Sequence, residues 1–590
     1  MHNPAFSQES EANMKRTGTL INKTYRNLLV STLAMTASMY LSSIVDGILV
    51  GQILGTMELS AINLTYSISF LKNILIAMFT FGGNTLAVMY KGKRDNKKAD
   101  LVFTISFWAG ILSSVLITVI GVALTDPTAD LLSQNKPELE PLIAAYLIPL
   151  WMTTPLTALN NQTAAFARTD GMKKLATALP IVANVINLFC DWLFMAVFGW
   201  GIAGAGWATV TGYALGSLLV IVYFKSKDRT VHFTREAIKK LGYMWKILNT
   251  GLPSALIYVC NFLRLFCINA IILSATGTFG TQIASVSFSL NSLCFIFIEG
   301  ATMTMLPVLG ALYGERDVKG QKLALRYGMW VTVGLSIIIL IISEVFPLPL
   351  AAMYGLTNPE ITSVFAITFR IMSINIPMLA IIYVMRTFFQ ATKQKWLANI
   401  LVILDGFATI VPLMYFFSKI DIYWLWWSFP ISKAATLLIT AIIMLIYKSV
   451  KHKDNFLLIE GEEGVALDFS IHNNVEEATD AAHKAVDFCT DNGVENNLAH
   501  DLGVAVEELC VNTARYAADS ASDSIDIYVK VSDNCVILKL RDNGKIFNPT
   551  EYVDDSGREV TGLKLVRSLT SSIEYNRVLG FNVTVVTVNR

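Results

Sequence analysis

The feature that most constrains this chain is a series of twelve apolar stretches, each long enough to cross a bilayer. A membrane-spanning helix needs about 20 consecutive apolar residues, because its backbone groups must bond to one another inside the hydrocarbon. Of the 590 residues, 54% are hydrophobic and only 15% are charged, which lies outside the range of soluble domains. The predicted spans lie near 28–50, 59–89, 101–124, 139–161, 175–198, 203–224, 248–273, 279–312, 324–347, 360–385, 396–417 and 421–447.

The loops between these stretches alternate in basic charge. Loops rich in Lys and Arg occur at 90–100, 167–174, 225–240, 313–322 and 386–395, whereas the intervening loops carry few or none. Because basic loops remain in the cytoplasm, this pattern predicts a multi-pass protein of the plasma membrane with both termini cytoplasmic. The first apolar run is too long for a signal-peptide core, so we interpret it as a retained span.

Two short motifs recur at nearly one spacing. YKGKRD (90–95) and LYGERD (312–317) are offset by 222 residues, and FART (166–169) and FQAT (389–392) by 223. Such a duplication predicts two six-helix bundles, related by an axis along the membrane normal and separated by a cavity. The predicted divisions are a cytoplasmic tail at 1–27, bundles at 28–224 and 248–448 with a linker at 225–247, a second linker at 449–463 and a polar domain at 464–590.

Polar and acidic residues lie at one depth in the first predicted bundle. Asp46, Asp191 and Thr209 each lie about five to seven residues from the outer end of a span, and Asn187 lies one turn from Asp191. Ionisable groups inside a membrane are costly and mark functional sites. Two carboxylates, an amide oxygen and a hydroxyl suit Na⁺, and paired acids can equally share a proton. Hydrogen bonding between helices is the structural alternative.

The second set of charges is mostly basic. It comprises Lys72, Arg264, Glu299, Arg370 and Asp405, all well inside their spans. We expect Glu299 or Asp405 to neutralise one of the bases, and Arg386 to reach the membrane interface. The set has a formal excess of one positive charge, which predicts a cavity that attracts anionic or zwitterionic substrates and repels lipophilic cations.

The first 450 residues resemble the multidrug and toxic compound extrusion (MATE) family of secondary antiporters. The motifs that carry the resemblance are VDGILVGQILG, GNTLAVMYKGKRDNKKA, NNQTAAFARTDGMKK, VINLFCDWLF and GWGIAGAGWATV. The resemblance implies export of small organic compounds, coupled to Na⁺ or H⁺. It also implies a cation site formed by Asp46, Asn187, Asp191 and Thr209. The extra bases at Lys72, Arg264 and Arg370 depart from a cavity for cationic drugs.

From about Gly464 the chain becomes polar and alternates short apolar strands with polar helices, as in an α/β sandwich. We expect strands at 523–533, 534–544 and 580–590, and helices at 474–493, 498–517 and 560–572. Within them, Glu508 and Asn512 lie one turn apart on a helix. Asp542 and Gly544 follow a strand, and Gly562 begins a helix.

These residue types suit a nucleotide site. An Asn oxygen can hold Mg²⁺, a Glu can deprotonate a nucleophile, and a glycine at a helix start lets phosphate reach free NH groups. The region 464–590 resembles GHKL-type (Bergerat-fold) ATPases, and within them the serine kinases that act as anti-sigma factors. The resemblance implies Mg²⁺-coordinating Asn512, catalytic Glu508, adenine-binding Asp542, Gly544 at the base and phosphate-binding Gly562. Lys564 stands where such proteins often have Gly, which favours nucleotide binding over efficient phosphotransfer.

Two functions follow from the sequence. The first is an ion-coupled antiporter in the lipid bilayer, with a cytoplasmic ATP-binding tail that senses nucleotide or acts on a protein target. The alternative is a membrane-anchored, serine-kinase-like signalling protein that uses the transporter body as a receptor. The net charge of +1 gives no support for nucleic-acid binding. No Gly-x-x-x-x-Gly-Lys-Ser/Thr motif is present, which disfavours a P-loop motor.

Overall fold

The computed structural model describes residues 18–92, 95–170, 172–227, 229–240, 242–314, 317–392, 394–450, 464–472, 475–517, 524–552, 561–578 and 581–590. In this part of the chain, ten helical segments are long and apolar enough to cross a membrane, and one of them covers 60 residues. That segment belongs to helix α10 (Tyr243–Gly314), which turns at Gly277 (φ 64°, ψ −156°) and therefore counts as two spans. With the 35-residue helix α2 (Thr19–Ile53), the twelve predicted spans are present.

The first bundle begins with α2 and is interrupted by a short π-helix after Asp191. It continues with α3 (Thr56–Gly92), α4 (Asn96–Ala123), α5 (Thr125–Ser133), α6 (Glu140–Thr169), α7 (Lys173–Asp191), the π-helix η1 (Trp192–Val197), α8 (Gly201–Gly216) and α9 (Leu218–Lys225). The 3₁₀-helix η2 (Arg235–Lys239) lies in the connection to the second bundle.

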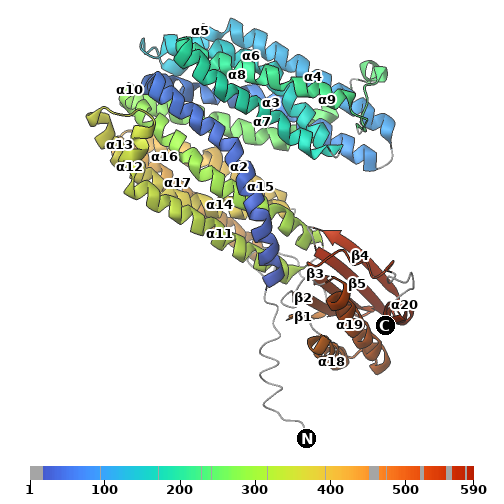
Figure 1. Ribbon diagram of the computed structural model, residues 1–590. Helices are drawn as coiled ribbons and strands as arrows, with labels where there is room; N and C mark the ends of the chain where they lie inside the picture. Colours follow the sequence, from blue (N-terminus) through green and yellow to red (C-terminus); the bar gives the residue numbers. More distant parts are fainter. Residues whose placement is uncertain are drawn as a thin grey trace.

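The second bundle has a π-helix of its own, which contains Asp405. It consists of α10, α11 (Val318–Val345), α12 (Pro347–Met353), α13 (Pro359–Ser373), α14 (Asn375–Ala391), α15 (Lys395–Ile403), the π-helix η3 (Leu404–Ala408), α16 (Ile410–Phe417) and α17 (Ile422–Val450). Figure 1 shows the two bundles side by side, the first in blue to green and the second in green to orange.

Helix α2 contacts both bundles. Near its start, the Tyr25 hydroxyl donates to the carbonyl oxygen of Ala301 in α10 at 2.7 Å, and Thr36 donates to that of Ile296 at 2.8 Å. Farther along, α2 packs against α7 and η1 of the first bundle. One helix therefore runs from the second bundle to the end of α7, where Asp191 lies. Helix α2 is the diagonal blue helix in Figure 1.

The bundles also meet at the last turn of α2. A Cβ atom on Gly51 would lie 2.3 Å from the carbonyl oxygen of Tyr354, so only glycine fits this crossing. The neighbouring Gln52 side chain donates to the carbonyl oxygens of Ala352 at 2.7 Å and Met353 at 3.0 Å. These contacts close the end of the membrane body that lies farthest from the C-terminal domain.

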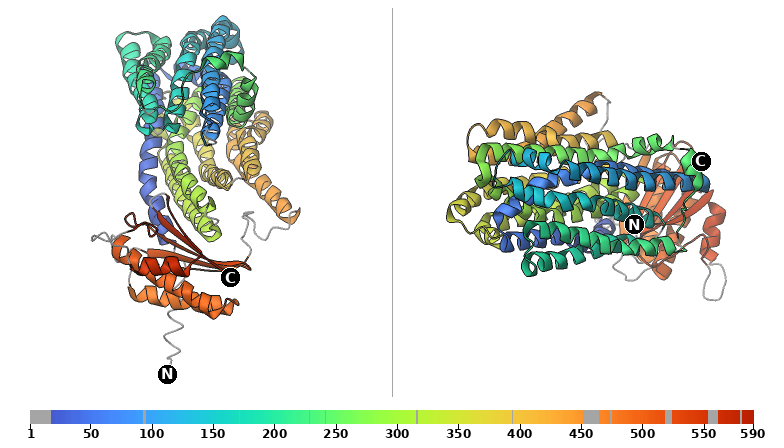
Figure 2. Two further views of the ribbon diagram at one scale, coloured as in Figure 1. Left: turned by 90° about the vertical axis from the view of Figure 1, so that its right-hand side faces the viewer. Right: turned by 90° about the horizontal axis from the view of Figure 1, so that it is seen from above.

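The C-terminal domain, which we call the tail, is a five-stranded antiparallel sheet with helices on one face. Its strands are β1 (Val465–His472), β2 (Ser524–Val531), β3 (Cys535–Asp542), β4 (Ser572–Val578) and β5 (Phe581–Asn589), in the order β1-β2-β3-β5-β4. Helices α18 (Val475–Asp491), α19 (Asn496–Asn512, continued by the π-helix η4, Thr513–Ala517) and α20 (Thr561–Leu569) pack on the sheet. Figure 2 shows the sheet between these helices and the membrane body.

The sequence-based outline of the tail needs two corrections. Strand β1 was not predicted, although alternate residues such as Phe469 and Ile471 enter the buried core of the domain. The last helix ends at Leu569, earlier than expected, because Ser572–Val578 pairs with β5 as strand β4. Most of the segment between Phe547 and Thr561 lies outside the described residues.

Candidate functional site

The structure brings Asp46 of α2 and Asp191 of α7 together. Their carboxyl groups lie within hydrogen-bonding reach of each other. Asp191 is fully buried, and one carboxylate oxygen of each residue (Oδ1) is buried with no hydrogen-bond partner. Among the residues that the structure describes, neither acid pairs with Lys or Arg. The two carboxyl groups therefore cannot be ionised at the same time unless a cation is bound.

Asn187 and Thr209 complete this group. The Asn187 amide donates to Asp191 Oδ2 at 2.9 Å and lies 3.4 Å from the Thr209 hydroxyl, which donates to the carbonyl oxygen of Ala205. The ring of Tyr146, a buried residue of α6, lies near both acids. The two unpartnered carboxylate oxygens, together with hydroxyl and amide oxygens, fit a hard cation such as Na⁺, and the acid pair also fits a shared proton.

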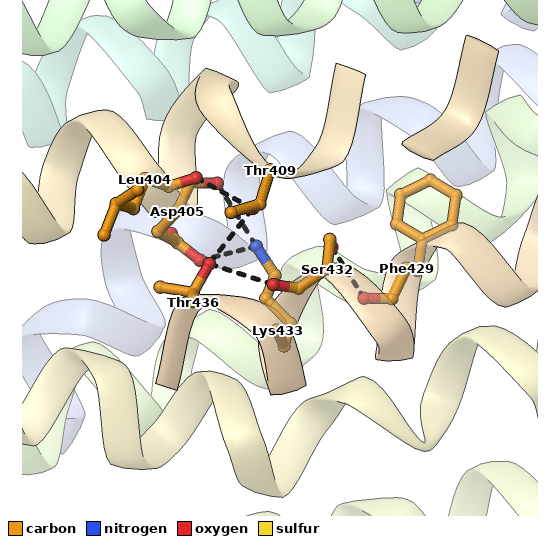
Figure 3. A network of polar contacts seen from close by, with 7 residues as sticks. All are labelled: Leu404, Asp405, Thr409, Phe429, Ser432, Lys433 and Thr436. Carbon is orange, nitrogen blue, oxygen red and sulfur yellow. Dashed lines mark hydrogen bonds and ion pairs between the residues drawn. The ribbon is translucent and has the colours of Figure 1, made fainter. Parts of the chain in front are cut away.

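The second bundle contains a buried ion pair. Lys433 of α17 donates to Asp405 Oδ1 at 2.5 Å, and both residues are less than 8% exposed. Asp405 lies in the π-helix η3, whose last turn is closed by Thr409 donating to Leu404, and the Thr409 and Thr436 hydroxyls are 3.0 Å apart (Figure 3). A π-helix shifts the backbone register by one residue and frequently marks a functional site.

Further charged groups surround this ion pair. The guanidinium groups of Arg264 and Arg386 lie close enough to Asp405 for their charges to act on it. Arg386 stacks over the ring of Tyr383 with its Cζ 4.1 Å from the ring centroid, and its position at the membrane interface stays a prediction. Glu299 accepts a hydrogen bond from the Tyr40 hydroxyl at 2.7 Å. We call these residues the C-bundle cluster: Tyr40, Arg264, Glu299, Tyr383, Arg386, Asp405 and Lys433.

Two of the predicted cavity residues lie elsewhere. Lys72 is buried in the first bundle, where its ammonium group donates to the carbonyl oxygen of Leu150 at 2.8 Å and to Thr153 at 2.5 Å. Arg370 is about half exposed and donates to the carbonyl oxygen of Glu344 at 2.9 Å. The five residues therefore do not share one cavity, because α3 and α13 direct Lys72 and Arg370 away from the C-bundle cluster.

In the tail, Glu508 and Asn512 project from α19 toward the start of α20. The Asn512 amide nitrogen donates to the carbonyl oxygen of Glu508 at 2.7 Å, so its amide oxygen is the atom that could ligate Mg²⁺. A Cβ atom on Gly562 would lie 1.8 Å from Glu508 Oε2. The Glu508 carboxylate thus lies against the first turn of α20, where free backbone NH groups favour an anion.

Asp542 is held in place at the end of β3. Its Oδ1 accepts from the backbone NH of Gly544 at 2.9 Å and from the Asn582 amide at 2.8 Å. Asn582 in turn donates to the carbonyl oxygen of Lys545, and its Oδ1 accepts from Arg577 and Tyr575. This network fixes the orientation of Asp542. A side chain that recognises a nucleotide base needs such a fixed orientation.

Burial also controls the thiols of the tail. Cys489 and Cys510 are buried, and burial in an apolar core raises the pKa of the Cys489 thiol to about 11 and that of the Cys510 thiol still further. Both are therefore protonated and unreactive at neutral pH, which agrees with a structural role.

Comparison with known proteins identifies the membrane body. The MatE family model matches residues 32–193 and 253–415, which together make up more than half of the chain. The chain belongs to the MatE family. The histidine kinase-like ATPase domain model matches residues 471–588, so this MatE protein carries a fused ATPase-like tail.

Relatives of this MatE protein include proteins named for multidrug export or resistance. Multidrug export protein MepA from Staphylococcus haemolyticus is 23% identical over 431 residues, which cover 72% of this chain and 94% of MepA. Probable multidrug resistance protein NorM from Rhizobium meliloti is 24% identical over 322 residues, which cover 52% of this chain and 67% of NorM.

Solved structures share the fold of the membrane body. An inward-facing multidrug resistance MATE family transporter matches with a TM-score of 0.64 and 20% identity, over 72% of this chain and 99% of its own. A MOP superfamily transporter from Pyrococcus furiosus, described as having a binding pocket of reverse polarity, matches with a TM-score of 0.58 and 21% identity, over 73% of this chain and 97% of its own.

Sequence reasoning missed several residues of these sites, among them Lys433, Tyr146 and Asn582. Lys433 lies in the last predicted span, and a lysine in an apolar run of that length is itself a signal. Tyr146 and Asn582 gave no such signal, because a tyrosine in a span and an asparagine in a strand are common. Only the structure places Tyr146 beside the acids and Asn582 beside Asp542.

Proposed function

We propose that this MatE protein is a cation-coupled secondary antiporter that exports small organic compounds across the plasma membrane, with both termini in the cytoplasm. The observation that carries the proposal is the pair of buried carboxyl groups of Asp46 and Asp191, which come from different helices and have no basic partner among the described residues. The relatives named as multidrug exporters support the export of small molecules.

The acid pair gives a simple coupling scheme. With Na⁺ or a proton bound, the two carboxyl groups are compensated and can remain close together. Without the bound cation, the two adjacent negative charges repel each other, and this repulsion would move α2 relative to α7. Because α2 also contacts α10 of the second bundle, its movement would be transmitted to the site of the transported compound.

The test is transport in proteoliposomes that contain no ATP, driven by an imposed Na⁺ gradient or an imposed pH gradient. Asp46→Asn and Asp191→Asn are expected to abolish gradient-driven flux while the protein still purifies as a folded species. Asp126→Asn, an exposed acid at the start of α5, is the matched control and is expected to transport normally. Normal flux in Asp46→Asn would refute the cation site, and whichever gradient drives the wild type identifies the ion.

We also propose that the transported compound is anionic or zwitterionic. The C-bundle cluster has three bases, Arg264, Arg386 and Lys433, against two acids, Glu299 and Asp405. Of the bases, Lys433 is the one directly paired with Asp405. The excess positive charge attracts a carboxylate or phosphate, and Tyr40 and Tyr383 offer aromatic surfaces beside it.

Competition against a labelled transported compound tests this substrate class. Carboxylate or phosphate compounds are expected to compete, and Arg264→Ala is expected to weaken their competition at least about tenfold, which corresponds to 1.4 kcal/mol. Efficient export of ethidium-like cations that Arg264→Ala leaves unchanged would show that the bases serve only as partners of the two acids.

For the tail we propose binding of ATP with Mg²⁺, with Asn512 as metal ligand, Asp542 at the adenine, Gly544 beside it and Gly562 at the phosphates. Bound Mg²⁺ would neutralise phosphate charge next to Glu508. In the full-length protein, Asp542→Asn is expected to weaken ATP binding at least about tenfold. Calorimetry that finds no ATP binding to the wild type would leave the tail as an interaction module.

The proposed catalytic role of Glu508 is to orient or deprotonate a hydroxyl of a cytoplasmic protein target. This role belongs to the alternative function, a signalling kinase with the membrane body as receptor. Absence of flux under every imposed gradient, together with phosphate transfer that Glu508→Gln abolishes, would favour that alternative.

A further inference from the structure

The face of the tail sheet opposite its helices is covered by the membrane body. Side chains on this face include charged residues that are nevertheless less than 10% exposed, among them Asp468, Asp526, Lys530 and Arg541. Charged residues at the surface of an isolated sheet would be hydrated, so their burial reflects contact with another part of the chain. We call this face the docking face.

Two parts of the membrane body meet the docking face. The first is Asp317 in the connection between α10 and α11, whose Oδ2 accepts from the Arg541 guanidinium at 3.0 Å, with both side chains at most 7% exposed. The second is Leu20 at the start of α2, which is 1% exposed and packs against Phe581 and Val583 of β5. The contact is therefore both ionic and apolar.

The tail contacts the second bundle at Asp317, and the first bundle has an aspartate at the equivalent position of its repeat. Asp95 and Asp317 are equivalent in the motifs that end YKGKRD and LYGERD, and each caps the next helix through its Oδ1. In the first repeat, Lys98 binds Asp95 Oδ2 at 2.7 Å. Its counterpart in the second repeat is Gly320, whose missing side chain leaves Asp317 Oδ2 accessible to Arg541.

The docking face and the ATP site share two paired strands. Arg541 pairs with Val583 across β3 and β5, and the next pair is Asp542 with Asn582. Successive residues of a strand point to opposite faces. Arg541 and Val583 therefore contact the membrane body, while Asp542 and Asn582 form the proposed adenine site on the other face.

We propose that the docking face is the interface through which ATP binding in the tail and the transport cycle are linked. The link runs along α2, which contacts the tail at Leu20 and carries Asp46 about 39 Å farther along the helix. A nucleotide that shifts β3 or β5 changes the contact with Asp317 and Leu20. By reciprocity, movement of α2 changes the affinity of the tail for ATP. This proposal rests on the proposed antiporter function and ATP site.

The test compares ATP dissociation constants of the full-length protein in lipid nanodiscs. Asp317→Asn keeps an oxygen to cap α11 but removes the charge, and it lies outside the ATP site. Gly320→Lys supplies the lysine of the first repeat as a competitor for Arg541. Both are expected to change the ATP Kd at least about fivefold, within the usual range of coupling between sites. Asp95→Asn, the matched change in the first repeat, is expected to leave it unchanged.

Flux in proteoliposomes supplies the second readout. ATP placed on the tail side is expected to change wild-type flux at least about fivefold and to leave the flux of Asp317→Asn unaffected. An equal ATP Kd in the wild type and both second-repeat variants, or an equal ATP effect on flux in the wild type and Asp317→Asn, would overturn the linkage. Loss of wild-type flux with the Kd difference intact would instead refute the antiporter and retain the docking interface.

Discussion

Breaking the ion pair between Asp405 and Lys433 is expected to destabilise the second bundle strongly. Both side chains are buried, and removing one partner of such a pair typically costs about 3–5 kcal/mol, because the other charge remains without compensation. The two single variants are expected to differ. After Lys433→Met, Arg264 and Arg386 still compensate Asp405, whereas Asp405→Leu leaves Lys433 beside two other positive charges.

We therefore expect a loss near about 3 kcal/mol for Lys433→Met and near about 5 kcal/mol for Asp405→Leu. The double variant Asp405→Leu/Lys433→Met is expected to recover most of the loss, since an apolar pair of similar volume is often as stable as a buried ion pair. For a bundle of this size, each kcal/mol lowers the melting temperature by roughly 2–4 °C.

The assay is thermal unfolding of the purified protein in detergent, followed by tryptophan fluorescence, for the wild type, both single variants and the double variant. A melting temperature lowered by roughly 6–12 °C for Lys433→Met and roughly 10–20 °C for Asp405→Leu, and restored in the double variant, would confirm the reasoning. Singles that melt with the wild type would show that water reaches the pair. A larger loss for Lys433→Met than for Asp405→Leu would show that the neighbouring guanidinium groups do not act on Asp405.

Three other substitutions or reagents test particular contacts. Gly51→Val is expected to keep the bundles apart beside Tyr354, since even a Cβ atom would lie 2.3 Å from the Tyr354 carbonyl oxygen. The equilibrium between joined and separated bundles at the last turn of α2 is expected to shift about 5- to 150-fold. Unchanged accessibility of this end of the membrane body to a labelling reagent would contradict this. Gly562→Ala is expected to displace Glu508 and to weaken ATP binding at least about tenfold. Ser568→Ala, a change at an exposed position of the same helix, is expected to bind ATP normally. Equal ATP binding by the two variants would disprove the close approach of Gly562 to Glu508. Among the tail thiols, a maleimide at neutral pH is expected to label the partly exposed Cys535 well before Cys489, because burial raises the pKa of Cys489 to about 11; equal labelling rates in the folded protein would be inconsistent with that burial.

The sequence predicts the membrane architecture well because the bilayer imposes simple rules on length and charge. Apolar length locates the spans, and the acid pair follows because Asp46 and Asp191 lie at one depth. The break between the two spans within α10 was also predicted, because Gly277, with its positive φ of 64°, lies between the predicted spans 248–273 and 279–312. Strand β1 was missed because it directly follows a linker, although Asp468 and Ser470 alternate with apolar residues as in a half-buried strand.

Long-range partners are what the sequence could not supply. Lys72, Arg264 and Arg370 look alike as bases in spans, yet the structure directs them to three different surroundings. Asp95 and Asp317 are equally alike in sequence, and only the positions of Lys98 and Arg541 distinguish them. The partners of Lys72, Arg264 and Asp317 lie more than 70 positions away in the chain, and that of Arg370 lies 26 positions away.

The most direct test of coupled export is the flux of the wild type and of Asp191→Asn in ATP-free proteoliposomes under an imposed cation gradient. The carboxyl pair predicts uptake or release of a transported compound by the wild type that follows the gradient and stops when the gradient is collapsed. It predicts no gradient-driven flux for Asp191→Asn. Flux of equal size in the two proteins, or wild-type flux that is the same under every cation gradient, would contradict cation-coupled export through the carboxyl pair.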